Sequence, residues 1–235
     1  MMPIHVDSLD QLPDHISAML LPFRVDFLNE NYIDSLVRDS RRFDAVQRAM
    51  TEFLEENGVV AYHYTRAYRQ SIQSNGLLIQ QGSQRRQWFL DTFGHLFTPD
   101  EISAIRTTWD RYFTKYQDSL RDGKICFNHT KDALTNGGAE PLLENFGGEM
   151  IYMPFDEHSS ISLKIKQIGD PLIVYCSLKP SLINGSWDYP SAVVWLSTYH
   201  RTINPEARLY DVDINTQVSV PPEDIIKIES VTSWK

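Results

Sequence analysis

The stretch Val-Val-Ala-Tyr-His-Tyr-Thr-Arg, residues 59–66, decides how the rest of the chain is interpreted. The run Val59–Tyr64 is branched and aromatic, which is typical of a buried strand. Arg66–Ser74 suits a short helix, and Gly76 supplies the left-handed residue that ends it. A buried strand with a polar His-x-Thr at its exit is unusual for packing alone.

Composition and charge narrow the class of protein. The chain has 235 residues, of which 42% are hydrophobic and 23% charged, so it can bury a full core. Because no apolar run approaches the length of a membrane span and the N-terminus lacks a signal pattern, we expect a cytosolic protein with no membrane partner. The net charge of −9 argues against a broad nonspecific grip on nucleic acid, although a local basic strip would suffice.

Helical patterns come first along the chain and strand patterns follow. We expect a helical segment over residues 1–57 and one domain over 58–235 with a helical insertion at about 82–122. Within the insertion, Thr98-Pro99-Asp100-Glu101 predicts a capped helix start, and an apolar stripe continues to Leu120. The predicted strands are Lys124–Asn128, Glu149–Met153, Pro171–Leu178, Ala192–Tyr199, Leu209–Ile214 and Ile225–Val231. This order favours an α+β fold over a doubly wound sheet.

Three short elements carry the candidate chemistry. His63 and Thr65 share one face of the first strand because strand side chains alternate, although a lone strand histidine is usually a structural residue. Phe127-Asn128 ends a second strand, where Phe127 is either a core residue or the stacking wall for a flat ring. Glu149 opens the third element directly after two glycines, and it is either a functional carboxylate or an exposed strand-end residue.

The other motifs are weaker. The chain has no P-loop, His-Glu-x-x-His, Gly-x-Ser-x-Gly or Cys-x-x-Cys motif, and its histidines lack metal-ligand spacing. Asp211-Val212-Asp213 would suit a divalent ion, but such a pair more often edges a strand, so we expect no metal cofactor. The basic strip near the first strand would consist of Arg66, Arg69, Arg85 and Arg86, which a solvated helix face explains equally well.

Taken in order, the three elements resemble the ADP-ribosyltransferases of the diphtheria-toxin and PARP-like branch. Val59–Leu78 is most similar to the corresponding segment of DarT-type toxins, which modify DNA bases, and of tRNA 2′-phosphotransferases. The likeness is detailed around Tyr62–Leu78 and Gly147–Tyr152 and looser over 58–231, and it leaves out 1–57 and the insertion. It implies a split antiparallel sheet at the core of the domain.

The resemblance also implies roles for individual residues. NAD would be the cofactor, consumed as a substrate, with His63 on the ribose of its adenosine half and Thr65 and the Gly76 turn seating it. Tyr64 or a neighbouring aromatic residue would stack near the nicotinamide, and Phe127 and Asn128 would complete the cofactor site. The catalytic residues would be Glu149 and His63. Glu149 would stabilise the positive charge that develops on the sugar as the C1′–N bond breaks.

Departures from the family pattern bear on the acceptor. Phe127-Asn128 stands where the PARP-like branch has Tyr and the toxin branches often have Ser. Gly147 stands where protein-arginine modifiers have Gln or Glu, which weakens an arginine acceptor and leaves nucleic acid open. Where the tRNA phosphotransferases have a basic residue, this chain has Glu149, which disfavours their activity.

These observations lead to one hypothesis and three rivals. The hypothesis is an NAD-dependent ADP-ribosyltransferase, an intracellular toxin or defence effector that modifies RNA or DNA, with Arg66 and Arg69 binding that substrate and a possible neutralising antitoxin protein as partner. The rivals are protein ADP-ribosylation, NAD hydrolysis, and a catalytically silent interaction module that docks through its aromatic-rich insertion.

Overall fold

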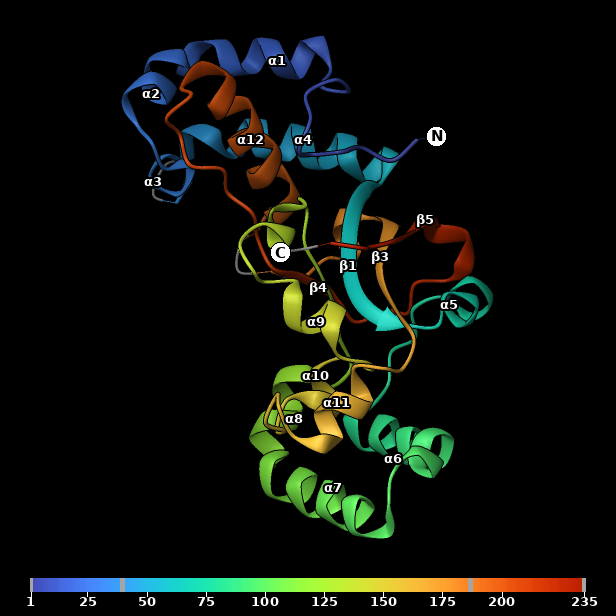
Figure 1. The fold of residues 1–235 in the computed structure, drawn as a ribbon. Coiled ribbons are helices and arrows are strands. Elements are labelled where there is room, and N and C mark those ends of the chain that lie inside the picture. The colour runs from blue at the N-terminus through green and yellow to red at the C-terminus, as the bar shows by residue number, and fades with distance from the viewer. Residues whose placement is uncertain (1, 39–40, 186–187, 234–235) are drawn as a thin grey trace. The chain divides into compact units, whose positions relative to one another are not determined.

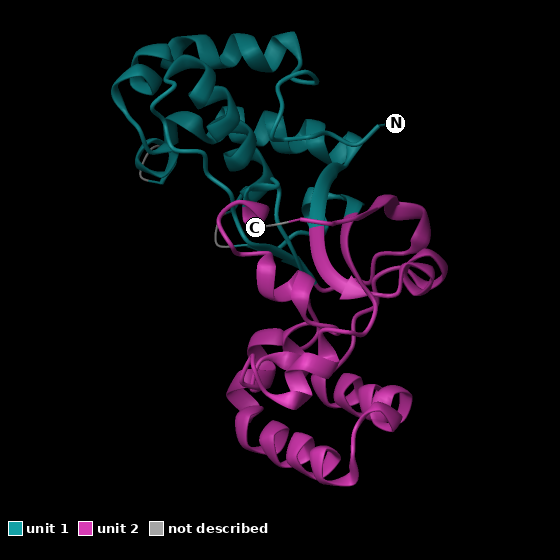
Figure 2. Cartoon of the chain, in the orientation of Figure 1, with its two compact units in different colours: residues 1–62, 126–132, 175–216 teal, residues 63–125, 133–174, 217–235 magenta. Residues whose placement is uncertain are grey.

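The computed structural model describes residues 2–38, 41–185 and 188–233, and the chain divides into two compact units (Figure 2). Unit 1 comprises residues 1–62, 126–132 and 175–216, and unit 2 comprises 63–125, 133–174 and 217–235. The predicted helical segment 1–57 falls within unit 1, whereas the predicted domain 58–235 contributes to both units. Residues 1, 39–40, 186–187 and 234–235 of these two segments lie outside the described residues.

Helices and two small sheets make up the described chain, so the predicted α+β class is confirmed (Figure 1). Within the described ranges, no helix combines the length and the apolar character needed to cross a membrane.

Unit 1 is mainly helical. Its longer helices are α4 (Asp44–Asn57) and α12 (Pro190–Ile203), which pack against each other. Val46, Met50 and Leu54 recur at helical spacing on α4 and are all buried, and Gly58 ends this helix with φ at +82°. The shorter helices are α1 (Asp14–Leu20), α2 (Arg24–Asn29) and α3 (Ile33–Val37), with 3₁₀ turns at Leu21–Phe23, Arg41–Phe43 and Pro180–Leu182.

Two sheets carry the strands. The larger has the order β1-β3-β5, where β1 is Val59–Ala67, β3 is Asp170–Leu178 and β5 is Ile225–Ser230. β1 and β3 are antiparallel, because Gly58 faces Ser177 in unit 1 and Gly169 faces Ala67 in unit 2. The smaller sheet pairs β2 (Ile125–Phe127) with β4 (Ile214–Thr216). The predicted strands at 59–64, 124–128, 171–178 and 225–231 are therefore confirmed, with small shifts of their ends.

Three predicted strands are wrong. Glu149–Met153 forms α10 (Glu149–Tyr152), because Gly147 and Gly148 both have positive φ and turn the chain into a helical start. Ala192–Tyr199 lies within α12: this run is buried almost throughout, so it lacks the polar face that marks most helices in a sequence. Of Leu209–Ile214, only Ile214 joins a strand.

Unit 2 holds the predicted insertion. Three helices form it, namely α6 (Gly82–Phe93), α7 (Pro99–Tyr112) and α8 (Lys115–Arg121), with a 3₁₀ turn at Gly94–Leu96. Thr98 and Glu101 form the predicted capping box at the start of α7. The predicted stripe does not continue to Leu120, because the helix ends at Tyr112, Thr114 caps a new one, and Leu120 is exposed.

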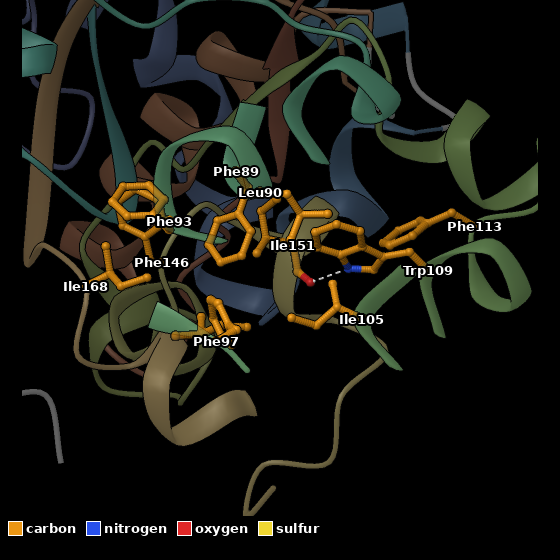
Figure 3. Packing of buried hydrophobic residues seen from close by; sticks show 11 residues of the cluster. Phe89, Leu90, Phe93, Phe97, Ile105, Trp109, Phe113, Phe146, Ile151 and Ile168 are labelled. Carbon is orange, nitrogen blue, oxygen red and sulfur yellow. Dashed lines mark hydrogen bonds between the residues drawn. The ribbon is translucent and has the colours of Figure 1, made fainter. Parts of the chain in front are cut away.

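The rest of unit 2 surrounds this insertion and the ends of β1 and β3. It contains α5 (Arg69–Asn75), α9 (Glu140–Glu144), α10 and α11 (Ser160–Ile165), and a 3₁₀ turn at Pro222–Asp224; a further turn, Asp132–Leu134, begins in unit 1. Aromatic and aliphatic side chains from α6, α7, α10 and α11 share one core, which includes Phe89, Trp109 and Ile151 (Figure 3). The insertion is thus packed into the unit and does not stand apart from it.

Candidate active site

β1 carries the first group of predicted site residues. The His63 side chain is half-buried, whereas Tyr64 and Thr65 are buried. Tyr64 therefore packs within the protein and presents little surface on which a nicotinamide ring would stack. His63, Tyr64 and Thr65 all lie in unit 2, at the end of the strand where the prediction placed the polar exit.

The Gly76 turn forms as predicted, and its shape has a structural cause. Gly76 ends α5 with φ at +72°, and a Cβ atom there would lie 2.0 Å from the backbone oxygen of Val220. Leu77 and Val220 exchange two backbone hydrogen bonds of 2.8 and 2.9 Å at this point. Close approach of two backbones accounts for the glycine, and a role in seating a cofactor remains a prediction.

The two arginines predicted to bind the acceptor are bound to the protein's own backbone. Arg66 Nε donates to the oxygen of Ile168 at 2.9 Å, and Arg69 Nη1 donates to the oxygen of Ile228 at 2.6 Å. Burial lowers the pKa of Arg66, against the opposing charges of Asp170 and Glu144. These guanidinium groups tie β1 and α5 to neighbouring segments.

Phe127 and Asn128 lie in unit 1, at the end of β2. Phe127 is buried, which agrees with its interpretation as a core residue. The backbone of Asn128 exchanges hydrogen bonds of 2.8 and 3.0 Å with Tyr62 of β1, and its side-chain Nδ2 donates to Asp213 at 3.0 Å. The predicted second element is thus hydrogen-bonded directly to the predicted first strand.

The two carboxylates of the Asp-x-Asp pair, Asp211 and Asp213, also accept hydrogen bonds from the segment that follows β2. Asp211 accepts hydrogen bonds from the backbone N–H of His129 at 3.1 Å and the hydroxyl of Thr130 at 2.6 Å. Burial raises the pKa of Asp211, and these hydrogen bonds oppose that shift. Among the residues that the structure describes, no group of three His, Cys, Asp or Glu side chains could hold a metal ion.

Glu149 is the carboxylate around which the candidate site is built. It begins α10 directly after Gly147 and Gly148, and its side chain is 43% exposed. Its Oε2 accepts a hydrogen bond of 2.8 Å from Nε of Arg121, whose side chain is only 15% exposed. Across the described residues, Oε1 has no hydrogen-bond partner, so one carboxylate oxygen is held and the other is available.

The backbone connects Glu149 to β1 within unit 2. Arg66 and Phe146 form a parallel bridge, and the N–H of Gly147 donates to the oxygen of Arg66 at 3.3 Å. His63 stands three positions before this bridge on β1, and Glu149 stands three positions after it. In a parallel bridge these offsets place the two predicted catalytic residues on opposite sides of the same backbone junction.

Side chains of the insertion hold the turn before Glu149, and sequence reasoning did not identify this role. Arg85 of α6 donates to the oxygen of Gly147 at 3.1 Å and lies over the ring of Trp88 at 5.6 Å. Burial lowers the pKa of Arg85. Nothing in the sequence indicated that Arg121 pairs with Glu149, since 28 residues separate the two.

Two aromatic residues bear on the helix that Glu149 begins, α10. Trp109 of α7 donates from Nε1 to the oxygen of Ile151 at 2.9 Å, which fixes α10 to the insertion (Figure 3). Burial, and to a lesser extent the charge of Glu149, raises the pKa of Tyr152. The phenol of Tyr152 therefore stays protonated well above neutral pH.

Comparison with protein-family models, with curated proteins and with solved structures gives no match for this chain.

Proposed function

We propose that the chain is an NAD-dependent ADP-ribosyltransferase in which Glu149 is the catalytic carboxylate. The observation that carries this proposal is the state of Glu149 in unit 2. One oxygen is bound to Arg121, the other is available, and the side chain is half-exposed at a turn of two glycines. A carboxylate that is both fixed and accessible suits the stabilisation of a cationic transition state.

The reaction would proceed at C1′ of the nicotinamide ribose. The C1′–N bond breaks, nicotinamide leaves with the bonding electron pair, and positive charge develops on the sugar ring. Glu149 Oε1 would accept a hydrogen bond from a ribose hydroxyl and stabilise that charge. An acceptor nitrogen or oxygen then bonds to C1′ and releases its proton, which Glu149 or water takes up.

The β1 residues would bind the other half of NAD. Under this proposal His63 contacts the ribose of the adenosine half, and Thr65 supports it from the same strand. The backbone bridge between Arg66 and Phe146 supports the proposal, because it ties the segment before Glu149 to β1. The split antiparallel sheet of an ADP-ribosyltransferase is part of this proposal, and the order β1-β3-β5 with a separate β2-β4 pair is compatible with it.

We propose a nucleic acid as the acceptor and the cytosol as the place of action. Gly147 stands where arginine-modifying enzymes carry Gln or Glu, which disfavours an arginine acceptor. A toxin or defence effector of this kind would need a neutralising partner, and the net charge of −9 suits a partner with a basic surface.

A specific observation favours NAD hydrolysis as the second candidate. Arg66 and Arg69, predicted to grip the acceptor, donate to backbone oxygens of the protein itself. If no other side chains bind a nucleic acid, water would be the acceptor at C1′. Glu149 would have the same role in both reactions.

The test uses the purified chain with NAD labelled in its adenylate phosphate and separate pools of RNA, single-stranded DNA and protein. The proposal predicts nicotinamide release and label on RNA or DNA, both lost in Glu149→Gln. Glu157→Gln serves as the matched control, because Glu157 is an exposed carboxylate elsewhere in unit 2. Nicotinamide release without transfer of label would favour hydrolysis, and label on protein alone would contradict the nucleic-acid acceptor. No turnover by the unmodified chain would contradict the enzyme altogether.

A further inference from the structure

The helical insertion is closed at its base and faces the Glu149 turn. The N–H of Gly82, the first residue of α6, donates to Oδ1 of Asp122, which follows α8, at 2.8 Å. This bond brings the two ends of the insertion together. Arg85 and Arg121 lie near those two ends, and both reach the 147–149 segment.

We propose that Arg121 and Arg85 are positioning residues that hold the Gly147–Glu149 turn, so that Oε1 of Glu149 is presented to the substrate. The expected effect on kcat rests on the proposed function, whereas the claim that the two arginines hold the turn does not. The insertion then belongs to the active site, although the family resemblance does not include the insertion.

Arg121 is rigidly placed for this role. Besides Oε2 of Glu149, its guanidinium binds Gln117 twice, at the backbone oxygen (3.2 Å) and at Oε1 (2.7 Å). Because planar guanidinium groups donate in fixed directions, this arrangement sets the orientation of the Glu149 carboxylate. An unpaired Glu149 would rotate about its side-chain torsions at the exposed start of α10.

Arg85 acts on the backbone of the turn. Gly147 and Gly148 have φ values of +85° and +74°, so this part of the chain has few restraints of its own. The Arg85 bond to the Gly147 oxygen supplies one, and its second bond, to Oε1 of Gln80 at 2.8 Å, fixes the guanidinium in place. Small displacements of a catalytic group cost activity steeply, which gives these contacts a kinetic consequence.

The first measurement is the steady-state kinetics of nicotinamide release by Arg121→Gln and Arg121→Lys. We expect Arg121→Gln to lower kcat by about 10- to 100-fold with KM for NAD within about threefold, because the substrate site persists while the carboxylate is misplaced. Arg121→Lys should recover part of kcat, since the ammonium retains the charge without the fork geometry. Arg85→Gln should act in the same direction.

Two matched variants control for a general effect on the insertion. Asp91→Ala removes the acceptor of a 2.7 Å hydrogen bond from Nε2 of Gln87 on the exposed face of α6, inside the insertion. Arg111→Gln removes an exposed charge from α7. We expect both variants to keep kcat within about twofold, whatever their stability, because neither contacts the 147–149 segment.

The second measurement is independent of activity. Amide hydrogen exchange should become faster at Ile151 and Met153 in Arg121→Gln, because their N–H groups donate to the oxygens of Gly148 and Glu149. Asp91→Ala should leave this exchange unchanged. The inference is overturned if exchange in α10 is the same in Arg121→Gln and the unmodified chain, or if Asp91→Ala lowers kcat as much as Arg121→Gln. Should the unmodified chain not turn over NAD, the proposed function fails, and the exchange result alone decides whether Arg121 holds the turn.

Discussion

The second half of β1, residues 63–67, and the Glu149 turn both belong to unit 2, and they are held in different ways. β1 is fixed by backbone hydrogen bonds, since it lies next to β3 in the sheet and bridges to Phe146 through Arg66. The Glu149 turn is fixed largely by side chains, namely Arg85, Arg121 and Trp109. The two halves of the proposed site therefore differ in what keeps them in place.

This difference predicts where substitutions act. A backbone hydrogen bond survives most changes of side chain, whereas a side-chain hydrogen bond is lost with one substitution. Residues of the insertion should thus influence the Glu149 half from far away in the sequence. On the strand side, only residues with special backbone geometry or full burial should have comparable effects.

The largest effect on stability should come from Trp109. Trp109→Ala removes a buried indole from the core of the insertion and leaves the Ile151 oxygen without its donor. We expect a loss of about 3–5 kcal/mol in the free energy of unfolding, measured by urea denaturation. Tyr116→Ala is the control, because Tyr116 is 68% exposed on α8 and its loss should cost under about 0.5 kcal/mol. Equal losses in the two variants would refute the side-chain account of this half.

His129 should make stability depend on pH through unit 1, beside the first half of β1. Burial lowers the pKa of His129 from 6.5 to about 4, and a contact with the backbone of Val60 opposes that shift. Within the described residues, neither ring nitrogen of His129 makes a hydrogen bond of good geometry. Between pH 6.5 and 4, the unfolded chain therefore binds a proton at His129 that the folded chain does not bind. Stability should be highest above pH 6.5 and fall as the pH drops toward 4.

The size of that effect follows from the shift. The free energy of unfolding should decrease by about 3 kcal/mol between pH 6.5 and 4 through this group alone. His129→Leu should flatten the profile over that window, measured by urea denaturation at several pH values. A profile equally steep in both proteins would show that another group is responsible.

Gly76 ends α5, the helix that follows β1, and tests the effect of backbone geometry on this side of unit 2. Gly76→Ala places a Cβ atom against the Val220 oxygen at a residue whose φ is +72°. We expect a loss of about 1–3 kcal/mol from the strained conformation. Gly123→Ala is the comparison, because Gly123 has φ at +65° but nothing within 4 Å of the added atom. If both substitutions cost the same, the close approach of Val220 has no energetic weight.

The smallest effect should come from the edge of the insertion. Thr98→Ala removes the cap of α7, whose side chain accepts from the N–H of Glu101, and should cost about 1 kcal/mol. Thr107→Ala in the middle of the same helix should cost under about 0.5 kcal/mol, because its hydroxyl only donates to the Ser103 oxygen of its own helix. Thermal unfolding of both variants distinguishes a capping effect from a general loss of threonine.

Local patterns predicted the elements whose structure depends on nearby residues. The strand from Val59, the turn at Gly76 and the capping box at Thr98 each rest on propensity or on a side chain a few positions away. The strand predicted at Glu149–Met153 is wrong because an apolar run of four residues suits a strand or a buried helix equally well. The strand predicted at Ala192–Tyr199 is wrong for a related reason, because a run that is apolar on every face does not distinguish a strand from a buried helix.

The surroundings of the candidate site were less predictable because they depend on contacts distant in sequence. The composition of the Gly-Gly-Glu segment singled out Glu149, but nothing in the spacing of residues pairs it with Arg121 or pairs Arg85 with Gly147. The arginines near β1 were assigned to a substrate because a charge pattern does not show which guanidinium groups will bind backbone oxygens. Such partners depend on how distant segments pack.

The most direct test is a crystal structure of the chain with an unreactive NAD analogue. We predict that the nicotinamide ribose will lie within hydrogen-bond distance of Glu149 Oε1, with the adenosine ribose at His63 and Arg121 still bound to Oε2. An analogue bound elsewhere, or one that contacts neither His63 nor Glu149, would contradict the proposed enzyme.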